Sequence, residues 1–344
     1  MRAKDLKKLV ALLKPHAGFP IGDPCLTYEQ GTFQAYNLSN VVARGHTEQT
    51  GFDATYNVAR LLRALSRLKA TDEVQMTPTG LVSGTTEYDL GVPPPVADFP
   101  DPWAFGDVLV TAGCLSPFAQ VAPMRDTSGA PGKVFLSGIL METTLDGTTL
   151  VGCDGKRMGY HAIPVTMPPE SAYKELQFVV PPEAVDTLCK MGQSSISGAW
   201  GKTDAVFSSG SVSLFVHHLD VDFPPWRKVI PTEHDWHMEF DRKKVLEALR
   251  RIDIRPPKKN DDHTRVVTID FRNGRTMLAM NVDDMHATDE LGCYPAGDFP
   301  HRISLDLLFF QEAVTHTQHP FIQGRGELDA VVVGGDNVIM PVRP

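Results

Sequence analysis

The sequence lacks the features that mark secreted or membrane-bound proteins. No apolar run is long enough to cross a membrane, and the charged first residues do not resemble a signal peptide. No two cysteines form a Cys-x-x-Cys pair, and an odd, dispersed set is typical of reduced thiols in a reducing compartment. The five cysteines are Cys25, Cys114, Cys153, Cys189 and Cys293. We therefore expect a cytoplasmic protein that does not bind membranes.

The sequence also offers little for metal binding. Twelve histidines are present, but the pairs His234-x-x-His237 and His316-x-x-His319 lack the further ligands of a known metal motif. We expect His316 and His319 to lie one turn apart near the end of a helix instead. These patterns predict no metal and no cofactor.

Two glycine-containing segments are interpreted as turns. Asp154, which precedes a glycine, resembles a catalytic acid beside a flexible residue, yet a turn between strands explains it without chemistry. Residues 334–337, Gly-Gly-Asp-Asn, are interpreted as a hairpin turn between the last two strands, because a phosphate loop needs a following helix. We therefore expect no catalytic residue.

What the sequence does have is a threefold internal repeat. Apolar helical stretches occupy 57–68, 181–191 and 305–316, and their starts are 124 residues apart both times. Asp98-Phe99-Pro100 and Asp222-Phe223-Pro224 are separated by the same interval. Self-similarity at a fixed period indicates that the chain is built from copies of one structural unit.

A second helix supports this division. Residues 5–14 match residues 241–250 in order and type. Strands that end in turns are predicted at 33–37, 150–155 and 277–281. We therefore predict three domains, each within the usual size range. Their boundaries are 1–103, 104–228 and 229–344.

Charge is unevenly distributed along the chain. The net charge is −9, with 33 Lys and Arg against 42 Asp and Glu. Segments 1–14, 57–69 and 241–251 nevertheless hold 14 of the basic residues and only 3 of the acidic ones. Apolar residues at i, i+3, i+4 and i+7 in these segments predict helices with one buried stripe, which leaves the basic residues on the exposed face.

A solvated helix face would explain one such basic stripe. Its recurrence on separate helices favours a surface for a polyanion, because Lys and Arg bind phosphates without sequence preference. The acidic remainder would discourage binding elsewhere on the molecule. The candidate DNA-contacting residues are Lys7, Lys8, Lys14, Arg60, Arg63, Arg67, Lys243, Lys244, Arg250 and Arg251.

Several segments, in order along the chain, resemble one known family. Residues 133–142, 150–158, 179–181, 222–231 and 338–343 are similar to the bacterial DNA polymerase III beta subunit, the replicative sliding clamp. The resemblance extends from about residue 104 to residue 344. Over the first hundred residues only the pattern of helix, strand and closing Asp-Phe-Pro persists.

The resemblance implies an α+β fold of three tandem DNA-clamp domains, with helices lining a central channel and antiparallel sheets on the outside. It implies a homodimeric ring around double-stranded DNA, bound without sequence specificity. Such a clamp is not an enzyme: it tethers the replicative DNA polymerase as a processivity factor. The clamp loader and repair proteins would bind it, like the polymerase, through short linear motifs.

The resemblance also implies a cleft between the second and third domains that binds extended peptides. The matching positions are Lys133, Leu136, Cys153, Gly155, Lys156, Arg157, Met158, Pro224, Lys228, Val229, Val338, Ile339, Met340, Pro341, Val342 and Arg343. Without the resemblance, the apolar members would be interpreted as ordinary strand core. Lys156 replaces a usual His and Cys153 a usual Thr, and Pro344 ends the chain, so the peptide preference is open.

Other hypotheses remain open as well. A specialised clamp-like protein of phage, plasmid or repair origin would bind the same peptides without standard ring formation, since ring closure needs complementary first and third domains. A monomeric scaffold would bind peptides without any ring. A metal-dependent hydrolase built on the histidines would require bound metal and would lose activity on a single Asp or His substitution.

Overall fold

The structure, a computed structural model, divides into two compact units that each draw on several chain segments. The first comprises Met1–Ala122, Gly138–Leu150 and Ala162–Val221, and the second comprises Pro123–Ser137, Val151–His161 and Asp222–Pro344. The described residues are 1–18, 24–36, 41–91, 110–112, 118–167, 173–191, 196–255, 266–317 and 319–343. The predicted boundary at 103/104 and the first Asp-Phe-Pro segment lie outside them.

The three longest helices of the first unit form where the sequence predicts them. In α1, Leu6, Leu9 and Val10 recur at helical spacing and are buried against the core. α2 begins after Asn57, whose side chain caps the helix by accepting a hydrogen bond from the Arg60 backbone amide at 3.0 Å. The helices are α1 (Ala3–Leu13), η1 (Lys14–His16), α2 (Val58–Leu65), α3 (Phe118–Val121) and α4 (Pro182–Met191), and η2 (Ala122–Met124) follows α3.

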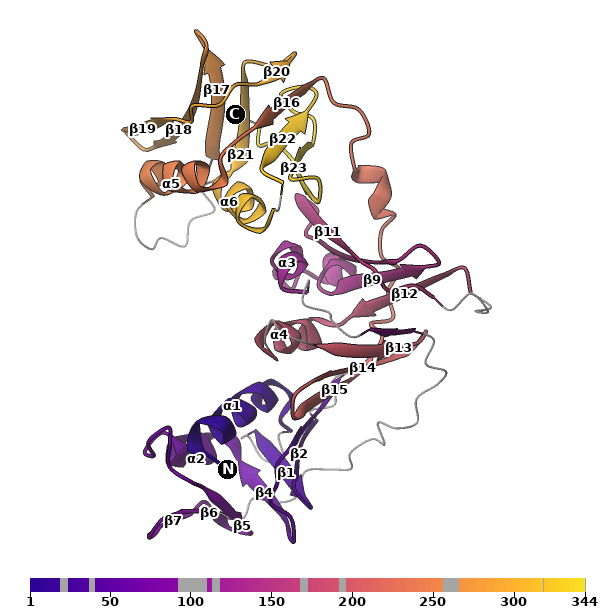
Figure 1. Ribbon diagram of the computed structural model, residues 1–344, viewed down its shortest axis with the longest axis vertical. Coiled ribbons are helices and arrows are strands. Elements are labelled where there is room, and N and C mark those ends of the chain that lie inside the picture. The colour runs from indigo at the N-terminus through magenta and orange to yellow at the C-terminus, as the bar shows by residue number, and fades with distance from the viewer. Residues whose placement is uncertain are drawn as a thin grey trace. The chain divides into compact units, whose positions relative to one another are not determined.

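An eight-stranded antiparallel sheet runs through the first unit, in the order β4-β1-β2-β3-β15-β14-β13-β8. β3 pairs with β15, so strands from both of the first two predicted domains join one sheet (Figure 1). The strands are β1 (Cys25–Glu29), β2 (Thr32–Tyr36), β3 (Val41–His46), β4 (Asp53–Asn57), β8 (Val110–Ala112), β13 (Ser197–Trp200), β14 (Asp204–Ser209) and β15 (Val212–His217).

Shorter strands complete the first unit. β5 (Gln75–Thr77), β6 (Gly80–Ser83) and β7 (Thr86–Asp89) form a three-stranded sheet. β9 (Ile139–Thr144) pairs with β12 (Glu175–Val180). The chain passes to the second unit within β10 (Thr148–Cys153) and returns within β11 (Arg157–Ile163).

The second unit packs two helices against antiparallel sheets. α5 and α6 contact each other and cover the sheet that contains β17 and β21 (Figure 1). Their first turns are capped by Asp241 and Asp306, whose carboxylates accept backbone hydrogen bonds. The helices are η3 (Pro131–Leu136), η4 (Trp226–Val229), α5 (Arg242–Ile252) and α6 (Leu307–His316).

The strands of this unit follow the order β11-β24-β23-β22-β16-β20 in one sheet and β19-β18-β17-β21 in another. Trp236, Ile269 and Phe310 lie in the core that they share with the helices. The strands are β16 (Trp236–Glu239), β17 (Val266–Arg272), β18 (Arg275–Val282), β19 (Met285–Glu290), β20 (Ala296–Gly297), β21 (Arg302–Asp306), β22 (Phe321–Gly324), β23 (Val331–Val333) and β24 (Asn337–Ile339).

Two local predictions for this unit have different outcomes. The hairpin turn at 334–337 is confirmed, because β23 and β24 pair on either side of it. The expectation that His316 and His319 share a helix is wrong. α6 ends at His316 because Thr317 adopts an extended conformation and uses its hydroxyl to bond the backbone of His319.

Candidate functional site

The predicted cleft residues at 157–158 and 338–339 lie on two paired strands of the second unit. Arg157 pairs with Ile339 and Met158 with Val338 in the antiparallel β11–β24 ladder. The Met340 amide extends it by donating to the Lys156 carbonyl at 2.9 Å. Met158, Val338 and Ile339 are buried, whereas Met340 is 47% exposed. The ladder therefore offers an apolar side chain at its accessible end.

The turn between β10 and β11 brings further predicted residues to this ladder. Gly155 has φ +87°, and a Cβ there would lie 3.9 Å from Lys133 Nζ and 4.0 Å from Leu136 Cδ1. Asp154 closes the turn by accepting the Lys156 amide at 2.8 Å. Cys153 is half-buried, and burial raises the pKa of its thiol. Lys133, Leu136 and the turn thus form one wall, next to the ladder.

Lys133 is held on this wall by two acceptors. Its ammonium donates to the Asp154 carbonyl at 3.2 Å and contacts the Asp126 carboxylate at 3.2 Å. Asp126 is buried, and hydrogen bonds from Ser128 together with Lys133 lower the pKa of its carboxyl. A buried carboxylate that is paired in this way fixes the position of the lysine.

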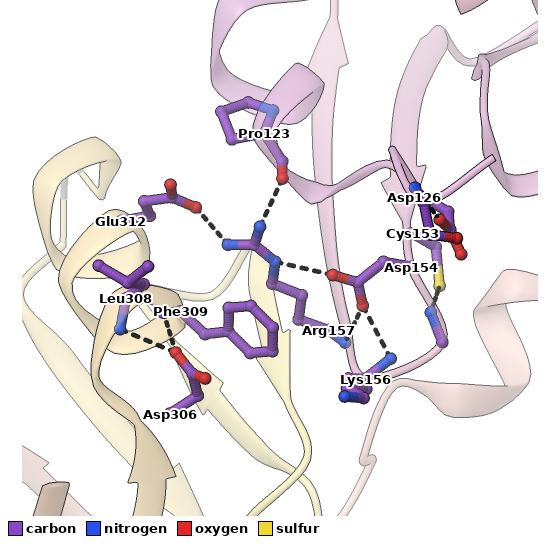
Figure 2. A network of polar contacts seen from close by, with 12 residues as sticks. Pro123, Asp126, Cys153, Asp154, Lys156, Arg157, Asp306, Leu308, Phe309 and Glu312 are labelled. Carbon is purple, nitrogen blue, oxygen red and sulfur yellow. Dashed lines mark hydrogen bonds and ion pairs between the residues drawn. The ribbon is translucent and has the colours of Figure 1, made fainter. Parts of the chain in front are cut away.

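Arg157 is the most heavily contacted side chain of the site (Figure 2). Its guanidinium lies over the Phe309 ring at 4.0 Å and forms ion pairs with Asp154 and Glu312. It also donates to the Pro123 carbonyl at 2.5 Å. A planar guanidinium suits this combination of stacking and several hydrogen bonds, which an ammonium could not reproduce.

The residues that hold Arg157 and Lys133 were not predicted. Phe309 and Glu312 lie on α6, and Glu312 is 155 positions from Arg157 in sequence. Contacts at such separation leave no local pattern in a single sequence. The one related prediction was the helix over 305–316, which carries Phe309 and Glu312. In the structure Asp306 caps this helix by accepting a hydrogen bond from the Phe309 amide.

The segment 224–229 approaches β11 through aromatic stacking. Trp226 is buried and its ring lies 5.5 Å from that of Tyr160. Tyr160 in turn donates to the Gly335 carbonyl beside β24. Pro224 is half-buried, while Lys228 and Val229 are exposed on this segment.

The last predicted cleft residues follow β24. The Val342 amide donates to the Ser304 carbonyl at 2.8 Å, which ties this segment to β21. Pro341 and Val342 are half-buried and Arg343 is exposed. The backbone from Met340 to Val342 is therefore held in place on both sides.

The basic residues of the first unit lie exposed on its helices. Lys7 and Lys8 extend from α1 and Lys14 begins η1. The three arginines of the α2 region line one hollow of about 480 Å³, together with residues of the β7 segment. One of them, Arg60, also donates to the Leu90 carbonyl at 2.8 Å. The hollow is lined by Arg60, Arg63, Ala64, Arg67, Tyr88, Asp89, Leu90 and Gly91.

The basic residues of α5 differ in what they contact. Lys243, Lys244 and Arg250 are exposed. Arg251 is exposed too, but its guanidinium forms an ion pair with Asp289 at 2.5 Å. This partner offsets part of its charge, so Arg251 offers less to an external anion than the other three.

Two further observations concern the described residues as a whole. Among them, no group of three His, Cys, Asp or Glu side chains is arranged to hold a metal ion. No helix within the described ranges combines the length and the apolar character that a membrane span requires.

Comparison with known proteins defines the class of fold. No protein-family model matches the chain. The chain superposes over 100% of its length on 98% of the DNA polymerase III beta subunit of Thermotoga maritima, with a TM-score of 0.79 and 14% identity. It superposes similarly on 99% of a Helicobacter pylori beta clamp bound to a DNA ligase peptide, with a TM-score of 0.76 and 14% identity. The protein has the α+β fold of the DNA sliding clamps.

The particular resemblance predicted from the sequence is confirmed by curated relatives. The beta sliding clamp of Synechococcus elongatus is 26% identical over 185 residues, which are 51% of this chain and 48% of that protein. At the level of sequence, the chain thus spans about half the length of the curated relatives it matches. Beta sliding clamps are the proteins that this chain resembles in both sequence and fold.

Proposed function

We propose that this protein is a DNA sliding clamp, a non-catalytic processivity factor that encircles duplex DNA as a homodimer and tethers a DNA polymerase. The observation that carries the proposal is the match in fold to sliding clamps over the entire chain. We further propose the three domains 1–103, 104–228 and 229–344, a cytoplasmic location and the clamp loader and repair proteins as additional partners.

The charge distribution supports the DNA-binding part of the proposal. The ten candidate residues are exposed on or next to α1, α2 and α5, although the chain as a whole carries a net charge of −9. Exposed Lys and Arg side chains can exchange contacts between equivalent phosphates, which sliding requires. An acidic remainder keeps DNA from binding elsewhere.

The β11–β24 ladder supports the peptide-binding part. Met340 and Val229 are exposed apolar side chains, and they lie on segments that flank the wall around Gly155. Exposed apolar surface of this kind is typical of a binding site. The H. pylori clamp in the comparison holds a DNA ligase peptide. We propose that partner proteins of this chain bind at the ladder through short extended segments.

Retention on end-blocked DNA tests the DNA-binding proposal directly. A linear duplex is fixed to beads at one end, the protein is allowed to thread on, and the free end is then capped. A ring is expected to survive a wash at about 0.5 M salt, which removes electrostatic binders, and to leave when the duplex is cut. Loss of the protein in the wash, despite the cap, would contradict the ring.

A charge-reversal variant tests which helices face the DNA. Arg63, Arg67, Lys244 and Arg251 are each changed to Glu, and a control carries Lys174→Glu and Lys202→Glu on exposed sites away from these helices. The first variant is expected to leave open-ended DNA faster, with a salt dependence that is flatter by up to about 0.9 per lost phosphate contact. Unchanged retention would contradict the assignment of these helices.

A further inference from the structure

Exposed apolar side chains around the β11–β24 ladder each lie beside a lysine. Val134 is 47% exposed and follows Lys133 in η3. Val229 is 55% exposed and follows Lys228 in η4. Met340, 47% exposed, is hydrogen-bonded through its amide to the Lys156 carbonyl. Three separate segments thus place an exposed apolar side chain beside a lysine.

The carboxylates of the site are already engaged. Asp126 contacts Lys133. Asp154 and Glu312 contact Arg157 (Figure 2). These contacts neutralise Lys133 and Arg157, which are both half-buried. A ligand at the ladder therefore meets cations that no local acid balances.

The cations that remain are Lys156, Lys228 and Arg343. All three are exposed, and within the described ranges none of them has a carboxylate at ion-pair distance. Asp336 is the acidic residue nearest to β24 in sequence, but it lies at the opposite end of that strand from Met340, about 13 Å away along the chain. Asp336 is half-buried, and burial raises the pKa of its carboxyl to about 6. Because of this distance, the Asp336 carboxylate offsets little of the positive charge of Lys156, which lies next to Met340 at the other end of β24.

From this arrangement we infer that the cleft selects partner segments whose apolar anchors are interspersed with Asp or Glu. The inference rests on the proposed function, because it specifies the peptides that the clamp cleft would bind. In an extended peptide successive side chains point in opposite directions, so apolar residues can reach the wall while their neighbours reach the lysines. Each exposed ion pair is weak, so selectivity needs several of them together.

Matched synthetic peptides test the inference. The first is a fluorescein-labelled peptide of about ten residues in which leucines alternate with aspartates, and the second has asparagine at every aspartate position. A third keeps the aspartates but replaces the leucines with serines. Fluorescence anisotropy at low salt is expected to give the first peptide roughly tenfold higher affinity than the second. The third is expected not to bind, because charge alone does not anchor it.

Variants locate the effect on the protein. Lys156→Gln combined with Lys228→Gln is expected to reduce the preference for aspartate to less than about threefold. A control with Lys174→Gln and Lys202→Gln removes the same net charge from exposed sites outside the ladder and is expected to keep the full preference. Added salt should lower the preference as well, since exposed charges are screened.

Separate outcomes overturn the inference and the function on which it rests. Equal affinity for the aspartate and asparagine peptides would overturn the selectivity while leaving peptide binding by the cleft intact. Strong binding of the serine peptide would overturn it too, because attraction would then be non-specific. Failure of every peptide to bind would overturn both the selectivity and the peptide-binding part of the proposed function, without affecting the DNA-retention test.

Discussion

His16 is a titratable side chain that the fold seals from water. It is 0% exposed, its Nε2 lies 2.7 Å from the Thr187 hydroxyl, and its Nδ1 has no hydrogen-bond partner in the described structure. Burial, with a smaller contribution from Lys190, lowers the pKa of His16 from 6.5 to about 4. The folded first unit therefore requires a neutral imidazole, whereas the unfolded chain takes up a proton below pH 6.5.

Acid should accordingly destabilise the first unit through this residue. Because the folded pKa is the lower one, stability is fully present above pH 6.5 and is lost as the pH falls towards 4, by about 3 kcal/mol. Urea unfolding at pH 7.5 and 4.5 measures the loss. His16→Gln, which does not titrate, should show a shallower pH dependence, and the exposed His46→Gln should behave like wild type. Identical pH dependence in all three proteins would refute this role.

At the scale of the element, the turn that joins β23 to β24 depends on Gly334. Its φ is +67°, and a Cβ there would lie 1.7 Å from the hydroxyl oxygen of Thr317. Thr317 cannot move easily, because it is buried and its hydroxyl donates to the His319 carbonyl. The close approach of Gly334 to Thr317 therefore sets where β24 begins.

Replacement of this glycine should damage the cleft as well as the turn. Gly334→Ala is expected to cost about 3 kcal/mol of unfolding free energy, since it adds overpacking to backbone strain. Gly210→Ala is the matched control: its φ is +57° with open space around it, so about 1 kcal/mol is expected. Denaturation measures both, and peptide binding should weaken only in the first. If both substitutions lowered the free energy of unfolding equally, Thr317 would have to move aside without cost, which would contradict this prediction.

At the scale of the whole molecule, the proposed ring predicts a definite mass. Each chain has a mass of 37.8 kDa, and a closed ring of two chains should keep twice that mass on dilution. Light scattering across a dilution series measures it. A persistent monomer would favour the peptide-binding scaffold, and a trimer would show that the ring closes with a different number of domains.

Sequence predicted the repeating elements well, because local periodicity determines them. The stripe of Leu6, Leu9 and Val10 and the apolar stretch 57–68 both predicted helices that the structure contains. Pairing of β3 with β15 was not predicted, because neither strand carries a local mark of its distant partner. The contacts of Arg157 were not predicted either, because its partner Glu312 is distant in sequence. Helical spacing also misplaced His319, which lies outside α6 and donates its backbone amide to the Thr317 hydroxyl.

The pairing of β11 with β24 has a consequence for biosynthesis. β11 is translated long before β24, and Met158 has no partner in the ladder until Val338 emerges from the ribosome. During that interval the edge of β11 that later pairs with β24 is open to pairing with another chain. A nascent chain in this state cannot offer the wall and the Met340 end together. Recruitment of partners at the ladder is thereby restricted to chains whose translation has passed the final strand.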